Sequence, residues 1–295
     1  MLKGSFVALI TPMDPQGRVD YEALSDLIEF HITNGTDGLI ILGTTGESAV
    51  FSVEEAVKVV SFAVTKANKR IPIIAGNGAN CTQKAIELTQ AMNHLDLEAM
   101  LCVTPYYNKP SPEGLKAHFI KIAESTEIPQ ILYNVPSRTG VDMQPETIAE
   151  LASHPNIIGV KEATGDLSRL HLLRALCGEN FALLSGDDET SMEFLLQGGD
   201  GVMSVVANVA PKQMKELVET SLEKNAERAN VINHQLSLLH KDLFIEANPI
   251  PVKWAMHRIG LISSAMLRLP LTELSEKYHI KIATALEVAG LEVHS

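Results

Sequence analysis

The chain has 295 residues, of which 45% are hydrophobic and 20% charged, as expected for a globular protein with one large domain or two smaller ones. Its 24 basic and 36 acidic residues give a net charge of −12, which argues against nucleic acid and anionic membranes as partners. The three cysteines are widely spaced and form no CxxC pair, so we expect neither disulfides nor a zinc site, and a cytoplasmic location. No apolar run is long enough to span a bilayer or to form a signal-peptide core.

Eight short apolar segments recur through the first two-thirds of the chain, and each is predicted to form a strand. Their starts are roughly 20 to 33 residues apart, which leaves room for a helix and two loops between neighbours. The predicted strands span residues 6–10, 38–42, 71–75, 99–103, 130–133, 157–161, 181–185 and 201–205.

The intervals between these strands carry helix signals. Residues 21–34 place several aliphatic side chains on one helical face. The run Ser52-Val53-Glu54-Glu55 has the pattern of a capping box. The run Ser111-Pro112-Glu113 supplies an N-cap, a proline at the first helical position and an early acid. We therefore expect strands and helices to alternate.

Most of the predicted strands are continuous apolar runs, which indicates burial on both faces, as in a parallel sheet covered by helices. Eight β/α units are the number that a (β/α)8 TIM barrel requires, and we assign a catalytic barrel to residues 1–210. An open doubly wound sheet is the alternative, but the chain has no GxGxxG after its first strand and no GxxxxGK loop. Residues 211–295 show helix signals only and are predicted to form a C-terminal helical extension packed on the barrel.

A lysine, Lys161, ends the sixth predicted strand. Burial penalises the charged form of a lysine, and the neutral amine can form a Schiff base with a carbonyl substrate. Position alone favours a solvated strand end or a charge that discourages edge pairing. Strand alternation turns Lys161 and Gly159 to one side and Glu162 to the other, so Glu162 is not expected to pair with Lys161. We expect Gly159 to leave space beneath the lysine stem, and Tyr133 to stand near the amine as a proton carrier.

Polar residues also follow the other predicted strands, at the end where a barrel carries its chemistry. Taken singly, each segment fits an ordinary turn, loop packing or a surface charge. Exposed backbone N–H groups in the turn at residues 43–46 would form a nest for a carboxylate. The ten histidines show neither metal-ligand spacing nor a Ser-His-Asp arrangement, so no metal site is predicted.

Five segments together resemble the dihydrodipicolinate synthase family. They are GTTGE at 43–47, TPYY at 104–107, YNVPSRTG at 133–140, KEAT at 161–164 and LSGDD at 184–188. One such segment is weak evidence, whereas five in order, each after a predicted strand, form a specific pattern along nearly the whole chain. The resemblance implies a pyruvate-dependent class I aldolase-like barrel, without organic cofactor or metal. Such a lyase condenses pyruvate with L-aspartate 4-semialdehyde on the diaminopimelate and lysine pathway.

The same resemblance implies roles for single residues in catalysis. Lys161 would form the Schiff base with pyruvate. Tyr133 would shuttle protons, relayed through Thr44 and Tyr107. In the family the tyrosine that matches Tyr107 reaches in from a neighbouring subunit, so a complete site needs a dimer. The resemblance also implies a homotetramer built from two tight dimers.

Substrate binding would fall to four further residues. Thr45, with its backbone N–H, would hold the pyruvate carboxylate, and the main-chain carbonyl of Met203 would line the same pocket. Gly186 is also expected among the substrate-binding residues. Arg138 would bind the carboxylate of the semialdehyde, a bidentate contact that suits a guanidinium. The related N-acetylneuraminate and 2-keto-3-deoxy sugar acid aldolases are the alternative, but they generally lack this arginine. A barrel that binds a metabolite without catalysis is a third possibility.

Feedback inhibition by lysine is predicted to be weak or absent. Family members that lysine inhibits bind it at a subunit interface, with histidines at the positions matching 53 and 56 and a glutamate at 84. This chain has Val53, Ala56 and Lys84 there, and a lysine side chain would repel the ammonium groups of the ligand. The other residues that still fit the site are Ser48, Ala49, Asn80 and Tyr106.

Overall fold

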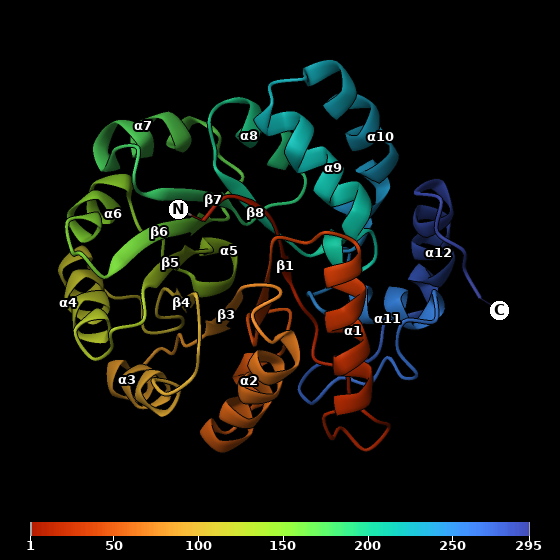
Figure 1. The fold of residues 1–295 in the computed structure, drawn as a ribbon, viewed down its shortest axis with the longest axis horizontal. Coiled ribbons are helices and arrows are strands. Elements are labelled where there is room, and N and C mark those ends of the chain that lie inside the picture. Colours follow the sequence, from red (N-terminus) through yellow and green to blue (C-terminus); the bar gives the residue numbers. More distant parts are fainter. Residues whose placement is uncertain (1, 295) are drawn as a thin grey trace.

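The computed structural model describes residues 2–294, and its eight strands close into one barrel in chain order (Figure 1). Neighbouring strands pair in parallel, and the eighth pairs with the first to close the ring. The predicted (β/α)8 barrel is therefore confirmed. The strands are β1 (Gly4–Ala8), β2 (Gly38–Ile41), β3 (Ile73–Gly76), β4 (Ala99–Val103), β5 (Gln130–Asn134), β6 (Ile157–Glu162), β7 (Ala182–Ser185) and β8 (Gly201–Ser204).

Helices follow the strands and cover the outside of the barrel. Between the strands lie α1 (Tyr21–Thr33), η1 (Ser48–Val50), α2 (Val53–Ala67), α3 (Thr82–Ala91), α4 (Pro112–Ala123), α5 (Pro136–Thr139), α6 (Pro145–Ala152), α7 (Ser168–Cys177) and α8 (Ser191–Leu196). After β8 come η2 (Val206–Asn208), α9 (Pro211–Leu222), α10 (Ala226–Asp242), α11 (Ile250–Arg258), η3 (Glu276–Tyr278) and α12 (His279–Val288).

Two helices begin at the caps that the sequence predicts. At the start of α2, Ser52 and Glu55 exchange both hydrogen bonds of a capping box, each at 3.2 Å. Ahead of α4, the Ser111 hydroxyl accepts a hydrogen bond from the Gly114 N–H, and Pro112 is the first helical residue. These side chains satisfy backbone donors that the first turn of a helix leaves unpaired.

The first strand lies two residues earlier than predicted, at Gly4–Ala8 rather than residues 6–10. Leu9 and Ile10 are as buried as strand residues. The Ile10 N–H, however, donates to the side chain of Asn208 at 3.1 Å. An apolar run indicates which residues are buried, but it does not show which group accepts the hydrogen bond of each backbone N–H. The sequence therefore misplaces the end of this strand.

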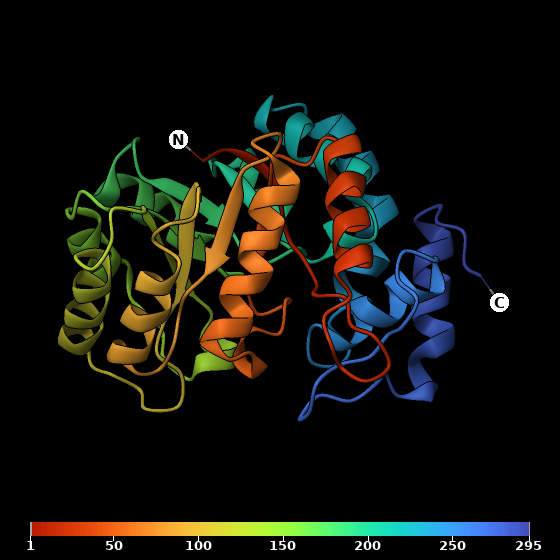
Figure 2. The ribbon, with the colours of Figure 1, turned by 60° about the horizontal axis from the view of Figure 1, so that its bottom comes forward.

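The buried side chains form three groups. One fills the inside of the barrel, and a second packs β4–β7 against α3, α4, α6 and α7. The third joins β1–β3 and β8 to α1 and α2 and also to α9–α12. Figure 2 shows the blue C-terminal helices beside α1, on the side of the barrel away from α4 and α7. The C-terminal helices therefore share one apolar core with the barrel.

The helix α9 packs against β1 and β8 and completes the eighth β/α unit. Helix α12 packs against α10 and α11, and α10 also contacts α8 and α9. The division of the chain at residue 210 stays a prediction about domains. Of the helices within residues 2–294, none combines the length and the apolar character needed to cross a bilayer.

Candidate active site

A cavity of about 570 Å³ lies at the carboxyl ends of the strands, where a barrel of this kind carries its site. The loops after β2, β5, β6, β7 and β8 contribute to its wall, which is completed by residues 244–248 between α10 and α11. Of the residues predicted from the sequence, the cavity is lined by Thr44, Thr45, Tyr133, Arg138, Lys161 and Gly186. Six residues from distant parts of the chain are thus brought together.

Lys161 and Tyr133 are direct neighbours in this cavity. They are register partners on β6 and β5, and strand alternation turns both toward the barrel interior. The Nζ atom of Lys161 lies 4.3 Å from the centroid of the Tyr133 ring. Lys161 is only 5% exposed, so its amine is largely shielded from bulk water. Because both side chains line the same cavity, a bound substrate or one water could carry a proton between the phenol and the amine.

Two glycines near Lys161 have different surroundings. A side-chain carbon added to Gly186 would lie 2.7 Å from the Lys161 Cε atom, so the absence of a side chain there gives the lysine stem its room. At Gly159 an added carbon would instead meet the Ala182 carbonyl oxygen at 2.7 Å. The prediction that Gly159 leaves space for the lysine stem is wrong, because Ala182 of the neighbouring strand takes that space.

Asn248 connects the two residues predicted to bind carboxylates. Its side-chain amide donates to the Thr45 hydroxyl oxygen at 2.9 Å, and its carbonyl oxygen accepts a hydrogen bond from Arg138 Nη2 at 3.1 Å. Thr45 is buried, whereas Arg138 is exposed at the mouth of the cavity. A shift of Asn248 would therefore move both residues.

A fully buried ion pair holds the loop that carries Thr44 and Thr45, residues 43–47, which we call the threonine loop. Lys253 Nζ lies 2.6 Å from Glu47 Oε1, and the two side chains are 0% and 1% exposed. Lys253 also donates to the carbonyl oxygen of Met266 at 2.7 Å. Burial lowers the pKa of Lys253, and the charge of Glu47 opposes this shift.

Asn248, Glu47 and Lys253 have no predicted role in the sequence analysis above. Asn248 is not named there, and Glu47 appears only as part of a family motif. Lys253 lies in the apolar helical run 250–256, and a lysine in such a run is the signal that could have found it. The same signal, a charge among buried apolar residues, makes Lys161 stand out.

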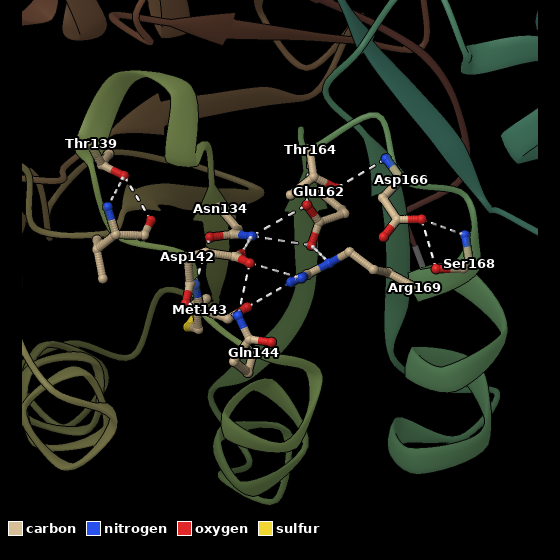
Figure 3. Close-up of polar contacts among 11 residues, drawn as sticks. Asn134, Thr139, Asp142, Met143, Gln144, Glu162, Thr164, Asp166, Ser168 and Arg169 are labelled. Carbon is tan, nitrogen blue, oxygen red and sulfur yellow. Dashed lines mark hydrogen bonds and ion pairs between the residues drawn. The ribbon is translucent and has the colours of Figure 1, made fainter.

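Glu162 points away from the cavity, as strand alternation predicts. Its Oε2 atom lies 3.2 Å from Arg169 Nε, on the outer side of the barrel (Figure 3). Burial raises the pKa of Glu162, while the charge of Arg169 and hydrogen bonds from Thr164 oppose the shift. The carboxylate next to Lys161 in sequence is therefore engaged elsewhere.

Two predicted site residues lie outside the cavity wall. Met203 is buried in the barrel interior on β8, and Val205, two residues further on, lines the cavity. Tyr107 is 89% exposed, on a loop where its own φ is +75°. Its contribution to a site stays a prediction, because it would involve a second subunit.

The residues predicted for a lysine site lie on the outer surface. Ser48 and Ala49 are exposed on η1, and Lys84 is exposed on α3. Val53 is exposed at the start of α2, whereas Ala56 is buried. The remaining two, Asn80 and Tyr106, are half-buried.

Two buried histidines stand apart from the cavity. Burial lowers the pKa of His31 to about 3 and that of His118 to about 4, so both are neutral at neutral pH. Their Nδ1 atoms contact the hydroxyls of Thr36 and Thr82, each at 2.9 Å. Among the side chains of residues 2–294, no group of three or more histidines, cysteines or acids is placed to hold a metal ion.

Comparison with known proteins identifies the family. The family model described as "Dihydrodipicolinate synthetase family" matches residues 1–289. A curated relative from Shewanella frigidimarina, named 4-hydroxy-tetrahydrodipicolinate synthase, is 57% identical over 293 residues, covering 99% of this chain and 100% of the relative.

Two solved structures have nearly the same fold as this chain. Chloride-inhibited dihydrodipicolinate synthase from Acinetobacter baumannii, complexed with pyruvate, is 50% identical with a TM-score of 0.96, covering 99% of this chain and 100% of its own. The enzyme from Cyanidioschyzon merolae with lysine bound is 37% identical with a TM-score of 0.95, covering 98% and 99%. The chain belongs to the dihydrodipicolinate synthetase family.

Proposed function

We propose that the protein is a 4-hydroxy-tetrahydrodipicolinate synthase, a lyase that condenses pyruvate with L-aspartate 4-semialdehyde through a lysine Schiff base. The observation that carries this proposal is the buried Lys161 amine beside the Tyr133 ring, in a cavity that also holds Thr45 and Arg138. Relatives at 57% identity bear the synthase name, and the related Acinetobacter baumannii structure contains pyruvate. These names support the synthase and not the sugar-acid or N-acetylneuraminate aldolases.

The first half of the reaction would activate pyruvate. The Lys161 amine attacks the ketone carbon, water leaves, and an iminium forms. This iminium withdraws electrons, so the pyruvate methyl group loses a proton and the adduct becomes an enamine. Tyr133 carries protons in these steps, with Thr44 as the next member of the relay. Thr45 holds the carboxylate of pyruvate. In this proposal the main-chain carbonyl of Met203 lines the same pocket.

The second half would join the two substrates. The enamine carbon attacks the aldehyde carbon, and the aldehyde oxygen takes a proton to become a hydroxyl. The amine of the semialdehyde then attacks the iminium carbon, closes the ring and releases the Lys161 amine. Arg138 binds the carboxylate of the semialdehyde through its guanidinium. The product of these steps is 4-hydroxy-tetrahydrodipicolinate, on the route to diaminopimelate and lysine.

The proposal includes an assembly in which Tyr107 of one subunit serves its neighbour. A tyrosine that is 89% exposed in one chain has the amphipathic ring that is common at interfaces. We accordingly propose a homotetramer built from two dimers. Cys81, Cys102 and Cys177 are free, which agrees with the proposed cytoplasmic location.

Trapping with borohydride tests the proposed mechanism. Incubation with pyruvate and borohydride is expected to add one reduced pyruvate to Lys161, detected by mass spectrometry of the digested protein. Lys161→Arg is the matched control and should gain no mass at this position. A folded wild-type protein that remains unmodified would rule out the Schiff base. Parallel assays of condensation with the semialdehyde and of cleavage of N-acetylneuraminate and 2-keto-3-deoxy sugar acids separate the synthase from the aldolases.

A further inference from the structure

A polar cluster lies on the outer side of β5 and β6 (Figure 3), the two strands that carry Tyr133 and Lys161. We propose that Arg169, which joins this cluster, is a positioning residue that holds the ends of β5 and β6 and thereby sets the spacing of Lys161 and Tyr133. The inference rests on the proposed function of these two residues. We call the cluster the outer network, and its members are Asn134, Asp142, Glu162 and Arg169.

The register of the sheet places the outer network next to the reacting pair. Tyr133 pairs with Lys161, and the next pair along the same two strands is Asn134 with Glu162. Asn134 Nδ2 lies 3.3 Å from both carboxylate oxygens of Glu162. Because successive side chains point to opposite faces, the outer pair and the inner pair share the same short piece of backbone. A displacement of one pair therefore displaces the other.

Arg169 contacts three acceptors with three different nitrogens. Its Nε donates to Glu162 at 3.2 Å, its Nη1 to Asp142 at 3.1 Å and its Nη2 to the Met143 carbonyl oxygen at 2.7 Å. The side chain is 10% exposed and comes from α7. A planar guanidinium fixes the relative positions of its acceptors, which a flexible ammonium group does not.

The other members complete the connection between β5 and the segment after α5. Asn134 Nδ2 donates to Asp142 Oδ1 at 2.8 Å, and the Met143 N–H donates to Asn134 Oδ1 at 3.0 Å. This segment follows the short helix α5 that carries Arg138. The outer network thus reaches β5, β6 and the chain leading from Arg138.

Backbone hydrogen bonds extend the outer network to the cavity wall. The Glu162 carbonyl oxygen accepts the Gly186 N–H at 2.7 Å, and Gly186 is the residue that gives the Lys161 stem its room. The Asn134 carbonyl oxygen accepts the Ala163 N–H at 3.0 Å, and Ala163 lines the cavity. A positioning role follows, because the network supports the walls of the cavity from the opposite side of the strands.

Removal of the Arg169 side chain would leave Glu162 and Asp142 without their shared cation. Two carboxylates near each other in a partly buried site repel each other, so the strand ends separate or one acid takes up a proton. Either response alters the backbone at positions 134 and 162. We therefore expect the loss to appear in the rate of the reaction as well as in stability.

Helix α7 supplies a matched control for this test. Arg174, on the same helix, also forms a partly buried ion pair, with its Nη2 atom 2.6 Å from Asp200 Oδ2. Asp200 immediately precedes β8, and its carbonyl oxygen accepts the Gly4 N–H at the start of β1. Arg174 therefore acts at the amino ends of the strands, away from the cavity, while Arg169 acts at the carboxyl ends.

The test compares Arg169→Met with Arg174→Met in the full-length enzyme. Both should lower Tm. Only Arg169→Met should lower kcat and the rate of the borohydride-trapped pyruvate adduct, by roughly 10- to 100-fold, the range that misplaced catalytic groups show. KM for pyruvate should stay within about 3-fold, because the outer network does not touch the carboxylate site.

A conservative variant keeps the test decisive. Arg169→Lys retains the charge but not the fork of donors, and its kcat should fall between wild type and Arg169→Met. If Arg169→Met does not fold, Arg169→Lys is compared with Arg174→Lys in the same assays. Equal losses of kcat in the two series, or a kcat of the Arg169 variants within about twofold of wild type, would overturn the inference. A wild-type enzyme that forms no adduct would instead contradict the proposed function.

Discussion

Two charge clusters support the cavity, and they are built from different parts of the chain. Glu47 and Lys253 are 206 residues apart in sequence and join the threonine loop to helix α11. Glu162 and Arg169 are seven residues apart and belong to a single β/α unit. One wall of the site therefore depends on the C-terminal helices, whereas the wall that carries Lys161 depends on the barrel alone.

The two clusters also differ in how their charges are balanced. The Glu47–Lys253 pair is almost completely shielded from water and contains one charge of each sign. The outer network has one cation against two carboxylates, and Asp142 is 36% exposed. A fully buried pair loses most when one partner is removed, because the other charge stays in a low-dielectric site. This difference predicts that the first cluster matters more for stability and the second more for the rate.

Lys253→Met is expected to have the largest effect on stability. It should lower the free energy of unfolding by about 3–5 kcal/mol, since the Glu47 carboxylate would remain buried without its cation. Urea unfolding at neutral pH measures this change. The matched control is Lys253→Met combined with Glu47→Gln, whose amide oxygen can still accept the Arg268 N–H. This double variant should recover more than half of the loss, and a single variant that costs under about 1 kcal/mol would contradict the comparison.

Two buried histidines, one on each side of the barrel, make stability depend on pH. His31 lies on α1, in the core shared with the C-terminal helices, and His118 lies on α4 on the other side. Their pKa values are about 3 and about 4 in the folded protein, below the value of 6.5 for an exposed histidine. The unfolded chain therefore binds more protons below pH 6.5, and stability falls as the pH falls.

At pH 5 each histidine should lower the free energy of unfolding by about 2 kcal/mol relative to pH 7. Urea unfolding of wild type, His31→Gln and His118→Gln at the two pH values separates the contributions. Each variant should lose less stability on acidification than wild type. Around pH 4 the folded protein already takes up a proton on His118 while His31 is still mostly neutral, so the His118 contribution stops growing first. Wild-type stability that is equal at pH 5 and pH 7 would contradict the burial of both rings.

Arg138→Ala tests the place where the two walls meet. Arg138 belongs to α5 of the barrel, and its guanidinium donates to the carbonyl oxygen of Asn248 from the C-terminal segment. Loss of a charged hydrogen bond to the semialdehyde should lower kcat/KM for that substrate roughly 10- to 100-fold. The yield of the pyruvate adduct at Lys161 should stay within about twofold. Equal damage to adduct formation would show that Arg138 acts on the pyruvate side of the site.

The sequence predicts the barrel-borne wall far better than the wall supplied by the C-terminal helices. Alternation along a single strand is enough to place Lys161 inward and Glu162 outward, and the spacing of neighbouring strands brings Tyr133 beside the lysine. Local patterns carry no information about contacts across 200 residues, so Asn248 and Lys253 have no counterpart among the predictions. The error at Gly159 has the same origin, because its neighbour Ala182 belongs to another strand.

The smallest expected effect is inhibition of the enzyme by the amino acid lysine. The predicted lysine site lies near the wall of the cavity that contains Glu47. Glu47 immediately precedes η1, which carries Ser48 and Ala49, so a ligand bound at this surface would act on the threonine loop. The Cyanidioschyzon merolae relative binds lysine, but this chain presents Lys84 as an exposed cation. Two like charges about 4 Å apart in water repel by about 1 kcal/mol, so lysine binding is disfavoured.

Lysine at millimolar concentration should therefore leave the condensation rate of wild type nearly unchanged at neutral pH. Lys84→Glu replaces repulsion with attraction, a change of about 2 kcal/mol, and should strengthen any inhibition by roughly 30-fold. Lys84→Gln, which removes the charge without reversing it, should fall between the two. The series separates charge from shape. If lysine inhibits neither wild type nor either variant, then Val53 and Ala56 also fail to make contacts that the ligand needs. Strong inhibition of wild type would instead show that attraction from neighbouring polar groups exceeds the repulsion from Lys84.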